Sequence, residues 1–355
     1  MMEPIYKFIH QTPMVVHTAA QWLQIFAVGA PFPLMVRVCQ RFLGTQKVVW
    51  PVAISTSVSA FIVHPIMLWI FVPTLGFMGS AVAIILTNSS QVILTLGYLY
   101  FRPVYHPGTW NGLSWEIFKD AVQIGPMLAF LRLSLGGVLS FGEWCFWGAT
   151  CFIAGSLGVI PLDIHSVANT LVPTLSMIPL GLSIALSLRM SHLMSESPAK
   201  ARKLAAIGMG SAILFGIIVS LLFYVCRDLI VRLFTTNEEV IQGCQEIWLD
   251  VCIMIILRFI YVINTGIMRS LGMQWRTAGF VFLVLWFSGL PTLVHVGAIG
   301  GVTAIWRCLP YFYFALNVLI MICYTIADWG KVNELIKEKK ARSEGLQATE
   351  ETRLV

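Results

Sequence analysis

The sequence predicts an all-α, polytopic membrane protein with about nine transmembrane helices. Of its 355 residues, 57% are hydrophobic and only 11% are charged, whereas a soluble protein needs about 25% charged residues. Nine segments are apolar over the roughly 20 residues needed to cross a hydrocarbon core. They are 21–39, 48–73, 79–101, 124–156, 165–188, 204–226, 247–268, 276–296 and 299–327.

An internal repeat relates two groups of these spans. The pattern Arg-x-Leu-Gly-x-Gln occurs at 41–46 and again at 269–274, 228 residues later. Each copy is followed by an apolar run that contains a proline and ends in glycines. These residues are Pro65, Gly76 and Gly79 in the first copy, and Pro291, Gly297, Gly300 and Gly301 in the second. Two related halves are typical of transporters, because moving one repeat against the other is a simple route to alternating access.

The repeat predicts a partial N-terminal lobe of three helices at 1–112, a C-terminal lobe of six helices at 113–330, and a charged tail at 331–355. The first lobe should begin roughly 110 residues before Met1, so we expect the chain to lack three helices of a twelve-helix parent. Lys and Arg cluster after alternate spans, and the positive-inside rule therefore places the C-terminus in the cytoplasm. Plasma membrane and organelle membranes are both compatible with this pattern.

Other classes of site have no pattern in this sequence. The eight cysteines are scattered and form no Cys-x-x-Cys or Cys/His motif, so we expect no metal site and no cofactor. No Ser/His pair or His/Asp/Glu cluster has catalytic spacing, which argues against an enzyme. No basic patch with interleaved aromatic residues is present, so nucleic acid is not an expected partner.

Several short segments follow the order and spacing of one transporter family. They are Gln40-Arg41-Phe42-Leu43, 113–116, Gly142-Glu143-Trp144, 178–183, 198–202, Phe234-Thr235-Thr236, and Gly266 with Arg269 and Gln274. Together they resemble the multidrug and toxic compound extrusion (MATE) transporters, particularly the eukaryotic branch. The resemblance implies twelve helices in two six-helix lobes, with substrate bound between the lobes. It also implies proton-coupled or sodium-coupled efflux of organic, often cationic, compounds.

Charged residues within the spans are the candidate functional residues, since a charge at mid-bilayer costs about 2.5–3.5 kcal/mol on insertion scales. Glu143 lies in the fourth predicted span beside Trp144 and Trp147, in the aromatic surroundings expected of a site for a cation or a proton. By resemblance it matches the first acid of the family segment Glu-Trp-Trp-x-(Phe/Tyr)-Glu, which carries protons and contacts substrate. The alternative is a protonated Glu that is hydrogen-bonded between helices.

The chain departs from the family pattern at several of these positions. Cys145 and Gly148 replace the second Trp and the second acid, and Thr170 replaces an acid that some relatives carry in the next span. Arg258, eleven residues before Arg269, lies where eukaryotic relatives usually have Asp or Glu. The residues predicted to bind substrate or ion are therefore Glu143, Trp144, Trp147, Thr170 and Arg258.

We hypothesise that Glu143 and Arg258 form an ion pair, because either charge alone would be costly at that depth. Such a pair would work against proton pick-up by Glu143, which leaves two outcomes: a transporter in which Arg258 holds an anionic or zwitterionic substrate, or a family member that has lost transport. Alternatively, Arg258 snorkels or lines a watery cleft. Arg132 and Arg307 are the other bases within spans, and we expect them to snorkel or to pack against loops.

The leading functional interpretation is a secondary efflux antiporter of small organic or xenobiotic compounds. Its expected partners are an organic substrate, a coupling proton or sodium ion, and the lipid bilayer. One alternative is a lipid-linked saccharide flippase of the same superfamily, supported only by Arg132, Arg258 and Arg307. A second alternative is a non-transporting, truncated remnant. Arg41 and Arg269 are predicted at cytoplasmic helix ends, where a cation can engage terminal carbonyls in a mainly structural role.

Overall fold

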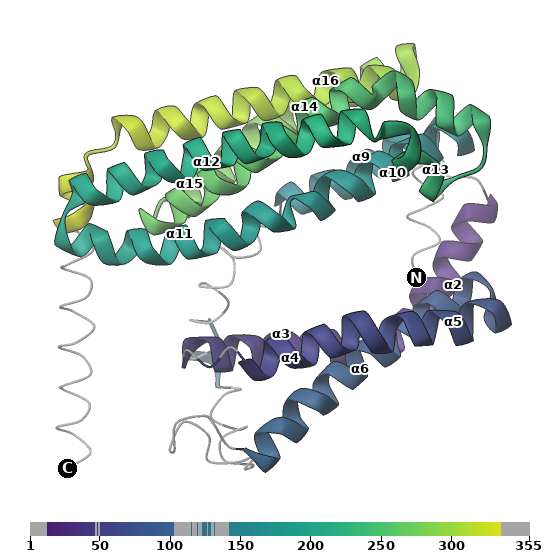
Figure 1. The fold of residues 1–355 in the computed structure, drawn as a ribbon, viewed down its shortest axis with the longest axis horizontal. Helices are drawn as coiled ribbons and strands as arrows, with labels where there is room; N and C mark the ends of the chain where they lie inside the picture. Colours follow the sequence, from purple (N-terminus) through teal and green to yellow (C-terminus); the bar gives the residue numbers. More distant parts are fainter. Residues whose placement is uncertain are drawn as a thin grey trace. The chain divides into compact units, whose positions relative to one another are not determined.

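The protein is all-α, as predicted, in the residues that its computed structural model describes. These are 13–46, 48, 50–102, 115, 119, 123–125, 127–128, 131 and 142–334. All regular elements within these residues are helices. The chain divides into two compact units, Met1–Pro126 and Met127–Val355, which Figure 1 colours from purple to yellow along the sequence.

Six of the described helices are long and apolar enough to cross a membrane, or seven if a pair bent by 50° between Gly29 and Pro31 is one span. The count is lower than the predicted nine for two reasons. The predicted spans 276–296 and 299–327 form one continuous helical stretch of 53 residues, Gln274–Ile326. The predicted span 124–156 falls partly outside the described residues.

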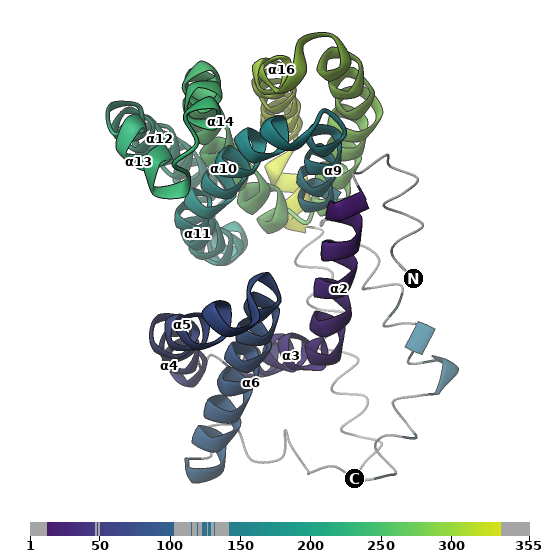
Figure 2. The same ribbon diagram turned by 90° about the vertical axis from the view of Figure 1, so that its right-hand side faces the viewer.

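The first unit is built on an antiparallel pair of helices. Its elements are α2 (Pro13–Gly29), α3 (Pro31–Thr45), α4 (Trp50–Val58), the π-helix η1 (Ser59–Val63), α5 (His64–Leu75) and α6 (Phe77–Phe101). The rod from α4 to α5 lies against α6 (Figure 2). Three side-chain hydrogen bonds join them, Ser55 to Thr95 (2.7 Å), Ser59 to Ser90 (3.0 Å) and His64 Nδ1 to Thr87 (2.9 Å). Such polar contacts between apolar helices stabilise helix pairs in lipid.

The second unit surrounds one buried helix, α14. Its elements are α9 (Gly142–Ser156), α10 (Val159–Leu175), α11 (Met177–Glu196), α12 (Pro198–Val225), α13 (Arg227–Phe234), α14 (Glu238–Ser270), α15 (Gln274–Val281), the π-helix η2 (Phe282–Gly289) and α16 (Leu290–Ile326). Helices α10, α11, α12 and α16 all pack against α14 (Figure 1), and 78% of its most apolar stretch is buried. A charge in the middle of α14 therefore needs a partner within the protein.

Matching local features inside the two units agree with the predicted repeat. A π-helix precedes the repeated proline in both copies. The π-helix η1 lies just before Pro65, and η2 lies just before Pro291. Gly76 (φ 60°) and Gly301 (φ 65°), 225 positions apart, then hold equivalent left-handed conformations. Each glycine begins the return of the chain in the opposite direction. The repeated unit is thus a π-bulged helix, a glycine turn and a returning helix.

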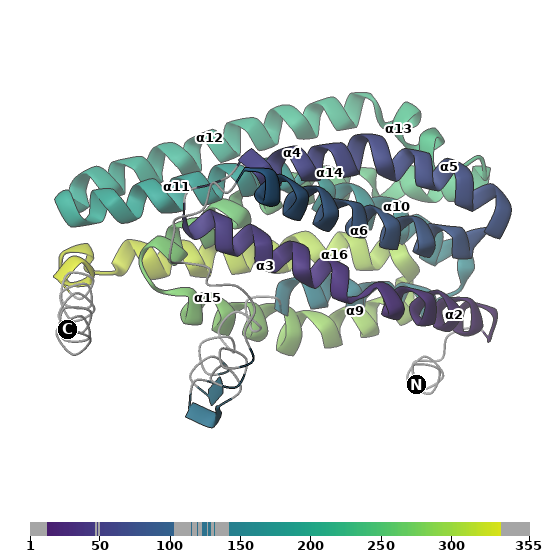
Figure 3. The ribbon, with the colours of Figure 1, turned by 90° about the horizontal axis from the view of Figure 1, so that it is seen from below.

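The Gly301 turn also explains the long stretch Gln274–Ile326. The segments on its two sides run antiparallel: Arg276 Nη1 lies 3.9 Å from Cys323 Sγ, and a Cβ built on Gly297 would lie 3.1 Å from Ile305 Cδ1. Helix α15 and η2 therefore run beside the second part of α16 (Figure 3). The two spans predicted from the sequence are present as a hairpin that bends at Gly301.

Replacing Gly301 with alanine should lower the free energy of unfolding by about 1–3 kcal/mol, because its φ of 65° and ψ of −159° lie in a region that is essentially restricted to glycine. Reversible unfolding in mixed micelles measures the loss. Gly279→Ala is the matched control, since Gly279 is helical and a Cβ there meets no atom within 4 Å. It should be neutral or stabilise by up to about 1 kcal/mol. Equal effects of the two variants would contradict the argument.

Candidate functional site

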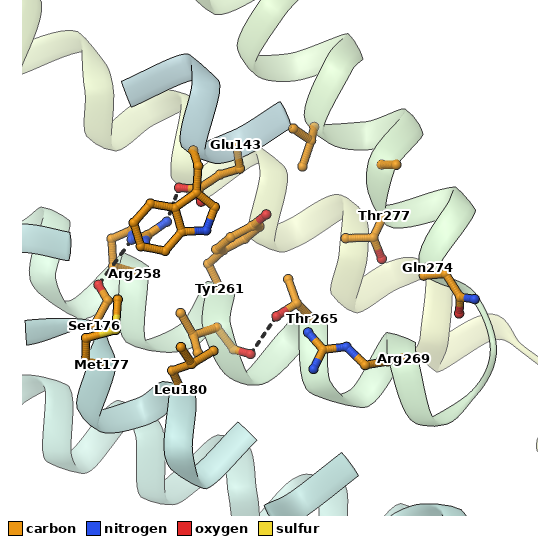
Figure 4. Close-up of a pocket in the computed structure, with 14 residues that line it drawn as sticks. Glu143, Ser176, Met177, Leu180, Arg258, Tyr261, Thr265, Arg269, Gln274 and Thr277 are labelled. Atoms are coloured by element: carbon orange, nitrogen blue, oxygen red, sulfur yellow. Dashed lines mark hydrogen bonds and ion pairs between the residues drawn. The ribbon is translucent and has the colours of Figure 1, made fainter. Parts of the chain in front are cut away.

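Glu143 and Arg258 form an ion pair inside the second unit, which confirms the pairing hypothesis. Arg258 Nη1 donates a hydrogen bond to Glu143 Oε1. Glu143 comes from α9 and Arg258 from the middle of α14, and their side chains are only 3% and 2% exposed. Figure 4 shows the two side chains pointing toward each other. Arg258 therefore does not snorkel to an interface.

The same carboxylate oxygen accepts two further hydrogen bonds. Trp147 Nε1, one turn along α9, donates to Glu143 Oε1 at 2.8 Å, and the Tyr313 hydroxyl from α16 donates to it as well. Hydrogen bonds to an ionised group are stronger than those between neutral groups. A cation that approached this oxygen would have to displace the guanidinium and two neutral donors.

The guanidinium of Arg258 is held from several sides. Its Nε donates to Ser176 Oγ at 3.2 Å, and Ser176 lies between α10 and α11. Four aromatic rings have their centroids 5.6–5.9 Å from Arg258 Cζ, within the range of cation–π attraction. These rings belong to Trp144, Trp147, Tyr261 and Tyr313. Arg258 is thus held by side chains from α9, α14, α16 and the α10–α11 junction.

A pocket of about 760 Å³, including the solvent at its mouth, opens beside the ion pair. Its lining residues are Glu143, Trp144, Ser176, Met177, Leu180, Arg258, Tyr261, Val262, Thr265, Arg269, Gln274, Thr277, Ala278 and Val281. Arg258, Tyr261, Thr265 and Arg269 recur every three or four residues and so share one face of α14. Figure 4 shows Glu143 and Arg258 at one end of the pocket, and Arg269, Gln274 and Thr277 at the other.

Comparison with known proteins gives a consistent result. The family model MatE matches residues 138–294, which include Glu143 and Arg258. Multidrug and toxin extrusion protein 1 of Danio rerio is 27% identical over 354 residues, 98% of this chain and 58% of the relative. The Homo sapiens protein of the same name is 26% identical over 274 residues, 76% of this chain and 47% of the relative.

Solved structures share the fold. The eukaryotic MATE transporter AtDTX14 matches with a TM-score of 0.78 at 20% identity, over 95% of this chain and 75% of that chain. The chain contains a MatE domain at residues 138–294. It is of the eukaryotic type, and it spans about half the length of the curated relatives it matches. Its apolar helices and its MATE relatives support an integral, multi-pass membrane protein.

A MOP superfamily transporter from Pyrococcus furiosus also shares the fold, with a TM-score of 0.69 at 13% identity over 95% of this chain and 74% of that chain. For that transporter, reverse polarity of the binding pocket suggests a different function.

The structure brings four of the five predicted site residues together. Glu143, Trp144 and Arg258 line the pocket, and Trp147 is buried behind Glu143, to which it donates. Thr170 does not join them: it is exposed on α10, outside the pocket, and its hydroxyl donates to Ser166 O in its own helix.

The other predicted bases do not add to the pocket. Arg307 is exposed on α16 and is not among the lining residues. Arg132 lies outside the described residues.

Sequence reasoning missed four residues around the site. Two of them could have been found from their spacing. Tyr261 lies three positions after Arg258 and Arg269 lies eleven positions after it, so all three residues share one face of a helix. Tyr313 and Ser176 carry no local signal. Tyr313 lies 170 positions from Glu143, and Ser176 lies 82 positions from Arg258. Only helix packing brings them to the ion pair.

Proposed function

We propose that this chain is a MATE-type secondary active efflux transporter, an antiporter that exports small organic or xenobiotic compounds at the expense of a proton or sodium gradient. The observation that carries the proposal is the pocket beside the buried Glu143–Arg258 pair, on the central helix of a membrane-embedded unit. Its curated relatives are named as multidrug and toxin extrusion proteins, and these relatives are transporters rather than enzymes. We propose a cytoplasmic C-terminus, from the positions of Lys and Arg in the loops.

In this proposal the substrate lies against Trp144 and Tyr261, with the Glu143–Arg258 pair as the polar wall of the pocket. Trp144 is 42% exposed, so its ring is available for stacking. Trp147 is a positioning residue, since it holds Glu143 and does not line the pocket. Thr170 is left out, because its hydroxyl lies outside the pocket.

The ion pair constrains how an ion gradient is coupled to transport. Glu143 Oε1 already accepts from Arg258, Trp147 and Tyr313. A proton or a sodium ion that binds this carboxylate must compete with the guanidinium for its negative charge, so coupling through Glu143 would weaken the ion pair during the transport cycle. The archaeal transporter with reversed pocket polarity supports the idea that one fold accommodates pockets of different charge.

Transport by the full chain in proteoliposomes tests the proposal. Under a pH gradient or a sodium gradient, we expect transport of at least one small organic dye and a loss of about 3–10-fold in Trp144→Ala, as an aromatic contact is worth about 0.5–1.5 kcal/mol. Trp275→Ala is the matched control, because Trp275 is 52% exposed on α15 but does not line the pocket. It should transport normally.

The same assay separates the alternatives. Movement of a lipid-linked saccharide without movement of organic dyes would favour the flippase. Absence of any transport under both gradients, in a folded protein, would favour a non-transporting family member. Equal losses in Trp144→Ala and Trp275→Ala would remove the pocket from the proposal.

A further inference from the structure

The charged groups that line the pocket do not cancel. Glu143 and Arg258 neutralise each other in their ion pair, but the pocket is also lined by Arg269. Arg269 is exposed, and none of the ion pairs found within the described residues involves it. The lining therefore carries one unpaired positive charge, at the end of the pocket opposite the ion pair.

The residues near Arg269 suit an oxygen-rich anionic group. Its side chain extends toward Thr265, and Gln274 and Thr277 lie at the same end of the pocket (Figure 4). The Thr265 hydroxyl donates to Val262 O at 2.8 Å, which leaves the guanidinium of Arg269 and the amide of Gln274 as the donors for a ligand. A guanidinium can bind both oxygens of a carboxylate or a sulfonate. These two donors are the Arg and the Gln of the second Arg-x-Leu-Gly-x-Gln copy.

The pocket also has an apolar wall that suits the body of an organic ligand. Met177, Leu180 and Val262 form this wall, together with the exposed ring of Trp144. Arg258 and Arg269 are eleven positions apart on α14, about 16 Å at 1.5 Å per residue. This spacing accommodates a ring system between the charged end of a ligand and the ion pair.

An organic cation fits this pocket poorly. The Glu143 carboxylate that would attract it is neutralised by Arg258, and its Oε1 also accepts from Trp147 and Tyr313. The unpaired guanidinium of Arg269 would also repel the cation. Like charges at close range disfavour binding and contribute to selectivity against the wrong ligand.

We propose that the pocket selects amphipathic organic anions over organic cations, with Arg269 as the residue that binds the anionic group and Arg258 as the fixed counter-ion of Glu143. This inference rests on the proposed transport function and adds the substrate class to it. Arg269 thereby has a binding role in place of the structural role expected from its position at a helix end.

Two dyes that share a xanthene ring test the charge preference, fluorescein as the anion and rhodamine 123 as the cation. Initial rates are measured with the full chain in proteoliposomes. We expect transport of fluorescein and little transport of rhodamine 123. Arg269→Gln should raise the KM for fluorescein by about tenfold or more, since a hydrogen bond to a charged group is lost. Arg269→Lys should retain part of the affinity, and Gln274→Leu should raise the KM less than Arg269→Gln.

Arg276→Gln is the matched control. Arg276 lies seven residues later, is exposed and does not line the pocket, so the same loss of charge should leave the KM unchanged. Equal KM values in Arg269→Gln and Arg276→Gln would overturn the role of Arg269. Transport of rhodamine 123 but not of fluorescein would overturn the anion preference and leave the proposed transport function intact. Transport of neither dye, nor of any other organic dye under either gradient, would overturn both.

Discussion

Replacing Arg258 with methionine while Glu143 remains should lower the free energy of unfolding by about 3–5 kcal/mol, the usual effect of removing one partner of a buried ion pair. Glu143 is 3% exposed, so its carboxylate would be left buried without a counter-charge. The cage of aromatic rings around Arg258 Cζ would lose its cation as well. Reversible unfolding in mixed micelles measures the loss.

The double variant Glu143→Gln/Arg258→Met is the control that isolates the charge. In the wild type, Trp147 and Tyr313 donate to Glu143. The Gln carbonyl of the double variant can still accept from both, and no buried charge remains. We expect it to recover most of the loss and to unfold within about 1.5 kcal/mol of the wild type, since replacing both members of a buried pair is often nearly neutral. If the double variant were as unstable as Arg258→Met, the loss would reflect packing and not an unpaired carboxylate.

Replacing Arg258 with aspartate should increase pH-driven efflux. The introduced carboxylate would face Glu143, and two carboxylates that share a site bind a proton between them because like charges resist ionising together. The shared proton would couple a pH gradient to this site. Efflux under a gradient of one pH unit should then exceed efflux without a gradient by about 5–10-fold, since proton occupancy changes up to tenfold per pH unit.

Arg258→Asn is the matched control, because Asn has the size of Asp and no proton to exchange. It should show no gain in pH-driven efflux. A monodisperse elution profile in detergent for both variants ensures that they are folded. Unchanged or lower pH-driven efflux in folded Arg258→Asp would count against the view that the ion pair limits proton coupling.

The spans and the repeat could be read from the sequence because both depend on local patterns. Apolar runs of about 20 residues predict membrane helices without knowledge of their neighbours. The prolines and glycines of the repeat have local conformational effects, and Gly76 and Gly301 indeed adopt matching positive φ angles. The separation of 276–296 from 299–327 was likewise predictable from the glycines between them.

The Glu143–Arg258 contact could be predicted although its partners are 115 positions apart. Charges are rare in the spans and costly in a membrane, so each had few possible partners. Thr170 shows the limit of the same approach. The resemblance placed it in the site, but α10 presents its hydroxyl outside the pocket.

Composition and local pattern thus determined the membrane class, the helices, the repeat and the partner of the buried carboxylate. Only the tertiary structure decided that Tyr313 and Ser176 complete the ion-pair shell, that Thr170 lies outside it, and that Arg269 lines the pocket without an acidic partner in the described chain. The physical reason is that a span is defined by its own side chains, whereas the walls of a pocket come from α9, α14 and α15 together with the α10–α11 junction. Their rotation and depth depend on packing between helices that lie far apart in the sequence.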